Sequence, residues 1–425
     1  MAKRKPNILY IICHDLGQHL NCYGHGTVNS PALDKLAGEG VRFENYFCAS
    51  TPCTPSRGCI MTGKYAHVSG CTGLTHLGFP LPDNQKTVVN HLNDGGYDTW
   101  HVGLQHERNG NGKNSYRHVI SNDCRMENVA NDTIKLLESG KLKEPFYLNS
   151  GSFEVHLPFD KPEYTPADPE KIDVPGWLPD NKYVREELAG FHGCIEYMDK
   201  HIGRILDSFN RSSYRDNTVV VFTTDHGMAF PRAKSTMYDP GIETALLMKF
   251  PESMGIRGGV KTELLHNVEL GPTLLEIAGI AIPGYMQGRS FLPLLKGGKY
   301  RENEYIFSEK NFHDIYDPMR CVRTGRFKYI RNFEKRRKLP LPRDIEDSIA
   351  SKELIKGALD DRPDEEFYDL QKDPLEFSNL MGNPDYAGKI NELKGILQEW
   401  MEKTNDPILR GSMPLNPDSK VREYS

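Results

Sequence analysis

Uninterrupted runs of hydrophobic, β-prone residues recur along the chain and predict buried strands. The two clearest runs cover residues 7–13 and 217–224, and similar segments lie at 95–103, 145–152 and 245–251. A strand that is hydrophobic at successive positions, rather than at alternate ones, is typical of a parallel sheet covered on both faces. These segments therefore predict the strands of a buried sheet.

Segments with helical features separate the strands. Residues 30–40 have apolar side chains at helical spacing and a glycine stop, and residues 184–209 and 268–279 are also predicted to be helices. We expect Asp199 and His201 to lie on the solvent side of the second helix. Strands that alternate with helices predict an α/β fold, in which helices sandwich a large mixed, mostly parallel sheet.

The pattern changes near residue 299, where short strands and a charged stretch replace the long strands. We predict strands within 305–308, 319–330 and 366–370 and a terminal helix around 390–401. The intervening residues 332–364 are strongly charged, and we expect them to be exposed. The chain is thus predicted to contain a main domain over 1–298 and a smaller α+β subdomain with a small antiparallel sheet over 299–425.

Composition limits the possible classes of function. The 425 residues carry a formal net charge of -5, which gives no general attraction to nucleic acid or to anionic lipid. No apolar run is long enough to cross a bilayer. The nine cysteines are an odd number without metal-finger spacing, which favours reduced thiols.

The N-terminus bears on the cellular compartment. Residues 1–6 are basic, but the apolar run that follows ends at His14 without a small-residue cleavage site. As written, the chain is expected to be cytoplasmic. It would be periplasmic or secreted if a leader has been removed.

Residues suited to binding a metal ion follow the two clearest strands. His14 and Asp15 directly follow the first of them, and Asp225 and His226 directly follow the second. Because ligands of doubly wound α/β proteins gather at the carboxyl ends of the strands, we expect these four side chains to act at one site. The alternative for either aspartate is a structural role as a turn former or helix cap.

The stretch at residues 53–63, Cys-Thr-Pro-Ser-Arg-Gly-Cys-Ile-Met-Thr-Gly, predicts a short helix that carries a nucleophile. Pro55 suits the first helical turn, and Gly63 suits the end of the helix. Cys53 then lies at the helix N-terminus, where unpaired N–H groups and the helix dipole favour a thiolate or a docked anion. Arg57 adds a positive charge one turn later. A buried or metal-binding cysteine is the alternative interpretation.

The string Cys-Thr-Pro-Ser-Arg at 53–57, followed by Thr62-Gly63, resembles the modification signature of the formylglycine-dependent sulfatases in the alkaline phosphatase superfamily. The resemblance implies an alkaline phosphatase-like fold. It also implies that a formylglycine-generating enzyme oxidises Cys53 to an aldehyde, whose hydrate supplies the nucleophilic oxygen. We therefore expect a sulfatase that hydrolyses a sulfate ester, carried by a carbohydrate or an aryl group, through this formylglycine.

The resemblance implies a divalent metal held by Asp15, Cys53, Asp225 and His226, with calcium as the expected ion. Sulfatases usually carry two adjacent aspartates after the first strand, whereas His14 stands at the first of these positions. Calcium prefers oxygen ligands, while imidazole suits manganese or zinc. Either His14 is a ligand and the site favours such an ion, or His14 turns away and fewer ligands remain.

The same resemblance implies the other catalytic residues. Arg57 and Lys234 are expected to bind the sulfate and to stabilise charge on its oxygens. His156 is expected to protonate the leaving group, and His106 to take a proton from the hydrated aldehyde. The alternatives are structural roles for the two histidines and a solvated side chain for Lys234.

One part of the family pattern differs. The family's Gly-Lys-x-His appears here as Gly103-Leu104-Gln105-His106, so Leu104 replaces a lysine that helps to bind sulfate in the family. Lys113 lies close downstream and is a candidate to supply this positive contact to the substrate.

Three other functions are open from the sequence. The two departures just described, at the first metal position and at the lysine, weaken the sulfate assignment, and the main alternative is a phosphonate monoester or phosphodiester hydrolase of the same superfamily. The Phe230-Pro231 stretch is similar to heparan N-sulfatases and suggests a sulfamidase, which hydrolyses an N-sulfate. A binding protein without activity is the third alternative. Residues 161–180 and 332–364 are expected to form loops that set specificity.

Overall fold

The computed structural model describes residues 4–110, 115–120, 123–336, 338–354, 362–415 and 418–422. Its main sheet has eight strands in the order β5-β4-β6-β1-β7-β8-β2-β9. They are β1 (Asn7–Cys13), β2 (Val41–Phe43), β4 (Asp98–Gly103), β5 (His118–Val119), β6 (Phe146–Gly151), β7 (Thr218–Thr224), β8 (Leu246–Lys249) and β9 (Gly259–Lys261). The strands from β5 to β7 in this order run parallel, whereas β8 is antiparallel to β7 and to β2. The sheet is therefore mixed and mostly parallel, as predicted.

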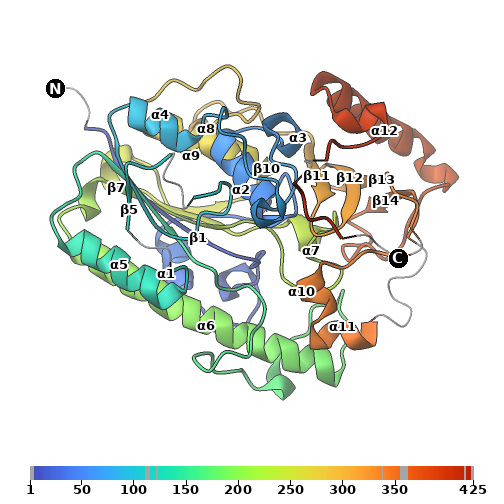
Figure 1. Cartoon of the computed structure of the whole chain (residues 1–425), viewed down its shortest axis with the longest axis horizontal. Helices are drawn as coiled ribbons and strands as arrows, with labels where there is room; N and C mark the ends of the chain where they lie inside the picture. Colours follow the sequence, from blue (N-terminus) through green and yellow to red (C-terminus); the bar gives the residue numbers. More distant parts are fainter. Residues whose placement is uncertain are drawn as a thin grey trace.

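Helices cover both faces of this sheet (Figure 1). One layer contains α1 (Pro31–Glu39), α5 (Met126–Glu138) and α6 (Lys182–Arg211), and the other contains α2 (Cys53–Thr62), α4 (Val88–Asp94), α8 (Leu270–Ile277) and α9 (Leu292–Leu295). Alternate residues of β1 face the two layers: Leu9 and Ile11 join the core with α6, and Ile8 and Tyr10 join the core with α8. Burial on both faces explains the uninterrupted hydrophobic run. The predicted sandwich is confirmed.

The expectation that Asp199 and His201 face the solvent was wrong. Both side chains are buried, because α1 and α5 cover the part of α6 that carries them. The carboxylate of Asp199 accepts hydrogen bonds from the backbone N–H groups of Ala32 and Leu33 at 2.9 and 2.8 Å. A carboxylate at these positions satisfies the free N–H groups in the first turn of α1 and complements the helix dipole.

The C-terminal part of the chain contains a second sheet, with four antiparallel strands in the order β11-β12-β13-β14. They are β11 (Ile306–Phe312), β12 (Tyr316–Arg323), β13 (Phe327–Asn332) and β14 (Glu365–Asp369). Helix α12 (Ala387–Lys403) packs on it through a cluster that includes Val322, Phe367 and Trp400. The smaller α+β unit is thus confirmed, while the boundary at residue 298 stays a prediction.

The remaining strands and α-helices of the described chain are short. They are β3 (Tyr46–Phe47), β10 (Leu265–His266), α3 (Ala66–Ser69), α7 (Asp239–Ile242), α10 (Arg343–Glu346) and α11 (Ile349–Leu354). Strands β3 and β10 pair in parallel as a separate two-stranded sheet. Among the described helices, none has both the length and the hydropathy that crossing a membrane requires.

The described part of the charged segment 332–364, which omits residues 337 and 355–361, is not simply exposed, contrary to the expectation from its composition. Leu341, Ile345 and Ala350 are buried in the core that also contains α6. The backbone N–H of Ala350 donates to Glu187 Oε2 on α6 at 2.7 Å. These contacts hold α10 and α11 against the main domain, close to the carboxyl end of its sheet (Figure 1).

Candidate active site

The carboxyl ends of β1 and β7 bring the predicted polar residues together. The two strands are parallel neighbours with Cys13 opposite Thr224, so the residues after them meet at one edge of the sheet. There Asp225 Oδ1 accepts hydrogen bonds from the backbone N–H groups of Asp15 at 3.0 Å and of His226 at 2.9 Å. These bonds fix the two strand ends to each other.

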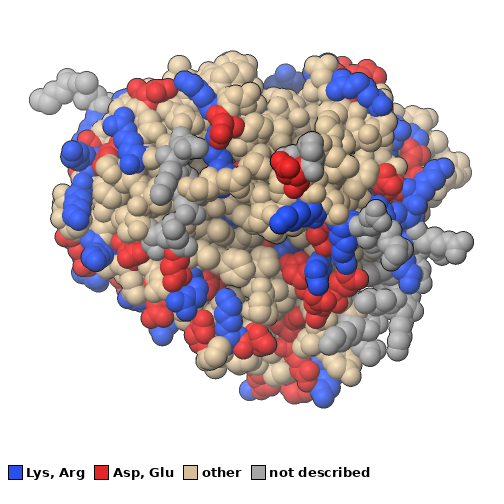
Figure 2. Space-filling model, in the orientation of Figure 1, with Lys and Arg blue, Asp and Glu red and all other residues tan. Residues whose placement is uncertain are grey.

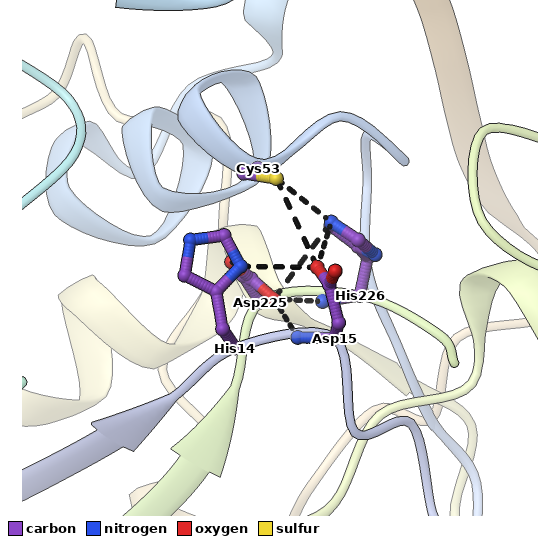
Figure 3. Close-up of side chains that lie close together, drawn as sticks. All are labelled: His14, Asp15, Cys53, Asp225 and His226. Atoms are coloured by element: carbon purple, nitrogen blue, oxygen red, sulfur yellow. Dashed lines mark hydrogen bonds and ion pairs between the residues drawn. The ribbon is translucent and has the colours of Figure 1, made fainter. Parts of the chain in front are cut away.

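Helix α2 directs Cys53 at these strand ends (Figure 3). The helix begins at Cys53 and ends before Gly63, whose φ of 63° is the left-handed conformation that glycine adopts readily. Cys53 Sγ lies 3.1 Å from His226 Nε2 and 3.9 Å from Asp15 Oδ1. The predicted helix is confirmed, and its first residue faces the side chains that follow β1 and β7.

The surroundings of Cys53 favour negative charge on its sulfur. Burial disfavours the thiolate, but His14 and Lys234 outweigh burial and hold the pKa of Cys53 well below its usual value. The N-terminus of α2 acts in the same direction. Burial likewise disfavours the charged form of His14, yet Asp225 and Cys53 raise its pKa to about 9. Cys53 and His14 therefore hold each other in charged forms.

A metal-site cluster is formed by His14, Asp15, Cys53, Asp225 and His226, whose ligand atoms all lie within 4.8 Å of one another. His14 Nδ1 is 3.0 Å from Asp15 Oδ1 and 3.2 Å from Asp225 Oδ2, and His14 Nε2 is buried without a hydrogen-bond partner among the described residues. Two buried carboxylates with this many additional donor atoms fit a divalent cation. The donor set also contains the nitrogens of His14 and His226, which are softer ligands than calcium prefers, whereas an aldehyde hydrate at Cys53 would replace the sulfur by oxygen. His14 lies within the cluster and does not turn away from it.

Arg57 and Lys234 contact the cluster through different aspartates. Arg57 Nε donates to Asp225 Oδ2 at 3.0 Å, and its Nη2 donates to the last carbonyl of β1 at 2.8 Å. Lys234 Nζ donates to Asp15 Oδ2 and to Asp344 Oδ2, each at 2.6 Å. Burial disfavours the ammonium of Lys234, but the two aspartates raise its pKa well above the usual value. Both residues are therefore fixed positive charges.

Two histidines complete the predicted set. His156 Nδ1 lies 2.7 Å from the Leu157 carbonyl, and His156 Nε2 lies 3.2 Å from Lys234 Nζ. The ring of His106 stacks on that of His76, with centroids 5.9 Å apart. Burial lowers the pKa of His106 to about 4, so its imidazole is neutral near pH 7.

Leu104 stands where the resemblance expects a lysine, so this position carries no positive charge. The backbone N–H of Leu104 donates to the Gly151 carbonyl at 2.8 Å. Leu104 lines a small pocket together with Arg57. The proposed substitute, Lys113, lies outside the described residues.

A cavity of about 580 Å³ borders Cys53 and receives side chains from both parts of the chain. Besides the predicted residues, its lining includes His76, His313 and Asp344, which sequence analysis missed. Figure 2 shows acidic side chains gathered on the face over α10, with basic ones beside them. The sequence contains one signal that the segment around Asp344 packs against the main domain. This signal is the group of apolar residues inside the charged segment, at Leu339, Leu341 and Ile345.

A family model described as Sulfatase matches residues 6–280, which is more than half of the chain. The chain belongs to the sulfatase family. The family resemblance and the assignment as a sulfuric ester hydrolase are confirmed. A second family model, described as N-sulphoglucosamine sulphohydrolase, C-terminal, matches residues 226–403 of this sulfatase.

Relatives of this sulfatase extend over most of its length. It is 28% identical to an ulvan-active sulfatase of Formosa agariphila, over 95% of this chain and 76% of that protein. It is 25% identical to the N-sulphoglucosamine sulphohydrolase of Homo sapiens, over 95% of this chain and 91% of that protein.

Solved structures share the fold of this sulfatase. A putative sulfatase from Bacteroides fragilis has a TM-score of 0.79 at 21% identity, covering 97% of this chain and 99% of that one. The phosphonate monoester hydrolase of Agrobacterium radiobacter has a TM-score of 0.73 at 20% identity, covering 99% of this chain and 100% of that one. At these identities the likeness shows the fold alone.

Proposed function

We propose that this sulfatase hydrolyses a sulfate ester on a saccharide, with the oxidised side chain of Cys53 as nucleophile and a divalent cation at the metal-site cluster. The observation that carries the proposal is the position of Cys53. Its Sγ lies at the N-terminus of α2, 3.1 Å from His226 and 3.9 Å from Asp15, at the border of the cavity. A nucleophile, a set of metal ligands and room for a substrate thus coincide.

The aldehyde and the cation would supply the nucleophile, and the residues of the chain position it and the substrate. A hydrated aldehyde at Cys53, polarised by a cation held by His14, Asp15, Asp225 and His226, would supply a nucleophilic oxygen near neutral pH. The N-terminus of α2 and Lys234 surround this position with positive charge, which favours the approach of an anionic sulfate ester. Asp225 is kept in place by its backbone hydrogen bonds and by Arg57.

The two histidines are suited to moving protons at the leaving group and at the nucleophile. His156 can donate its Nδ1 hydrogen to the Leu157 carbonyl at 2.7 Å, so its Nε2 is the atom left to face the leaving oxygen. Burial and Lys234 lower the pKa of His156, so Nε2 has to take up a proton before it can pass one to that oxygen, and the Lys234 ammonium 3.2 Å away is the nearest donor among the described residues. His106 is neutral and borders the cavity next to Cys53, so it can accept a proton from a hydroxyl at Cys53. Release of sulfate by that deprotonation explains the need for an aldehyde hydrate with two hydroxyl groups.

A saccharide is supported as substrate by the relatives, one of which is named for ulvan and another for N-sulphoglucosamine. The match to the C-terminal family model of N-sulphoglucosamine sulphohydrolase over residues 226–403 supports hydrolysis of an N-sulfate as the second candidate function. The phosphonate monoester hydrolase shares the fold only, and we place this activity third.

The proposal is tested with protein produced together with a formylglycine-generating enzyme and supplied with calcium, manganese or zinc. The kcat/KM values are compared for an O-sulfated glucosamine, N-sulfoglucosamine, an aryl sulfate and an aryl phosphonate monoester. We expect the O-sulfated saccharide to have the highest value. If the N-sulfated sugar has the highest kcat/KM, the second candidate function replaces our proposal. If the phosphonate has the highest kcat/KM, the third candidate replaces it.

A further inference from the structure

Helix α10 carries a carboxylate into the active-site cavity from the C-terminal part of the chain. Asp344 Oδ2 lies 2.6 Å from Lys234 Nζ and 3.5 Å from His156 Nε2. Asp344 Oδ1 is buried and has no hydrogen-bond partner among the described residues. Because a buried carboxylate oxygen without a partner is costly, this atom is available to accept a hydrogen bond from a ligand in the cavity.

The two oxygens of Asp15 separate the metal side of the site from the side of Asp344. Asp15 Oδ1 faces His226 at 3.1 Å and Cys53 at 3.9 Å. Asp15 Oδ2 faces Lys234 at 2.6 Å, and Lys234 in turn contacts Asp344. Since His156, the proposed proton donor to the leaving group, also lies on the Oδ2 side, Asp344 lies where the group released from the sulfate would be bound.

Asp344 is held in this position by the packing of its segment. The backbone N–H of Arg343 donates to Asp314 Oδ2 at 3.1 Å, and the N–H of Ala350 in α11 donates to Glu187 at 2.7 Å. Ile345, the next residue in α10, is fully buried in the core. A carboxylate fixed from both sides is well suited to select among ligands, because it cannot move away from an unfavourable neighbour.

The charge of Asp344 decides what it selects. Burial favours the neutral acid, but Lys234 and His313 hold the pKa of Asp344 below its usual value, so it is ionised near neutral pH. An ionised carboxylate only accepts hydrogen bonds, and it repels a second anion at the same place.

We infer that Asp344 determines specificity by accepting a hydrogen bond from a hydroxyl or ammonium group next to the sulfated position of the sugar. A second sulfate at that neighbouring position is disfavoured. This inference rests on the proposed function and narrows its substrate to saccharides with a hydrogen-bond donor beside the scissile sulfate.

The test compares matched monosaccharide sulfates in which the neighbouring position carries a free hydroxyl, hydrogen or a second sulfate, with an aryl sulfate as the reference. The wild-type kcat/KM is expected to fall from the first sugar to the third. In Asp344→Asn, the kcat/KM for the hydroxyl sugar should fall roughly 10- to 100-fold, as for the loss of a hydrogen bond to a charged group. The aryl sulfate should lose less, since it has no such group, and the preference for hydroxyl over sulfate should shrink.

Glu346→Gln is the matched control, because it removes a charge from an exposed side chain of the same helix that is not among the residues lining the cavity. It should keep the wild-type preference. Turnover of the aryl sulfate by Asp344→Asn shows that the variant is folded. If Asp344→Asn lowers the kcat/KM of every substrate by the same factor, Asp344 only positions Lys234. Our inference is then overturned, while the sulfatase function stands. If the matured wild type hydrolyses none of the sulfates, the proposed function fails and the inference fails with it.

Discussion

Two buried groups of ionic side chains in this sulfatase differ in how their charges are matched. The Arg320 cluster consists of Arg320, Asp406, Glu309 and His67, all buried. Arg320 binds Asp406 through Nε at 2.5 Å and Nη2 at 2.8 Å. Its Nη1 donates to two backbone carbonyls, and its Nη2 also donates to Met413 Sδ at 3.5 Å. Glu309 has His67 Nδ1 at 2.9 Å and Arg320 at 3.6 Å. Each acid in this cluster therefore has a base of its own.

The metal-site cluster also contains salt bridges, but it leaves ligand atoms facing one another. One ligand atom each of His14, Asp15 and Cys53 lies within 4.8 Å of the others, and the cluster borders a cavity of about 580 Å³. The comparison teaches that buried charge alone does not identify a site. Gathered ligand atoms beside an open cavity do so, and each cluster should respond differently to the loss of one member.

The largest expected effect is on turnover by Cys53→Ala. Because this variant removes the nucleophile, kcat should fall by at least about 10³-fold, with little change in the melting temperature. Cys59→Ala, on the same buried helix, is the matched control and should keep most of its turnover. Sulfate release by Cys53→Ala close to the wild-type rate would refute the assignment of the nucleophile.

The Arg320 cluster should show the opposite response. Arg320→Met leaves Asp406 and Glu309 buried without their arginine, so the free energy of unfolding should fall by about 3–5 kcal/mol. The kcat per folded molecule should stay at the wild-type value. Denaturant unfolding followed by circular dichroism measures the first quantity, and Lys389→Met provides the comparison.

Lys389 forms an exposed ion pair with Glu392 at 2.6 Å, so its removal should change stability by only about 0.5 kcal/mol. If Arg320→Met lowers the free energy of unfolding by as little as Lys389→Met does, the Arg320 cluster contributes no more to stability than a surface ion pair.

Metal binding should stabilise the protein through the metal-site cluster alone. After treatment with a chelator, a divalent cation at 100 times its Kd should raise the free energy of unfolding by about 2.7 kcal/mol. Asp225→Asn should lose this gain, whereas Cys59→Ala should keep it. We expect manganese or zinc to bind more tightly than calcium, and His14→Asp to shift the preference toward calcium. An unchanged preference in His14→Asp would argue against His14 as a ligand.

The smallest effect concerns pH and Glu309. Burial disfavours its ionised form, but His67 and Arg320 hold its pKa at about 2, compared with about 4.3 in an unfolded chain. A depressed pKa stabilises the fold above pH 4.3, and this contribution is lost as the pH falls toward 2. The stability difference between the wild type and Glu309→Gln should therefore be on the order of 2 kcal/mol at pH 7 and should shrink between about pH 4.5 and 2. Urea unfolding at several pH values checks this, and a constant difference would contradict it.

The strands and the residues directly after them could be predicted because their signals are local. The hydrophobic run of β1 requires burial on both faces, and the rule that ligands gather at strand ends then places Asp15 and Asp225 together. The position of Cys53 followed from the proline and glycine that begin and end α2.

The contribution of Asp344 could not be predicted, because nothing local distinguishes it from the other acids of a charged segment. Its position depends on Ile345 and Ala350 packing against α6, which lies about 150 residues earlier in the chain. The prediction for Asp199 was wrong for a related reason. Its carboxylate accepts hydrogen bonds from the N–H groups in the first turn of α1, and the hydrophobic periodicity of a helix does not reveal its contacts with a distant helix.

The most direct test of the central claim joins a mass measurement to an assay. Preparations made with different amounts of a formylglycine-generating enzyme are digested, and the fraction of the peptide around Cys53 that carries an aldehyde is compared with the specific activity toward a sulfate ester. We predict that activity rises in proportion to the aldehyde and vanishes where only the thiol is found. Full activity in a preparation whose Cys53 is entirely thiol would contradict the account.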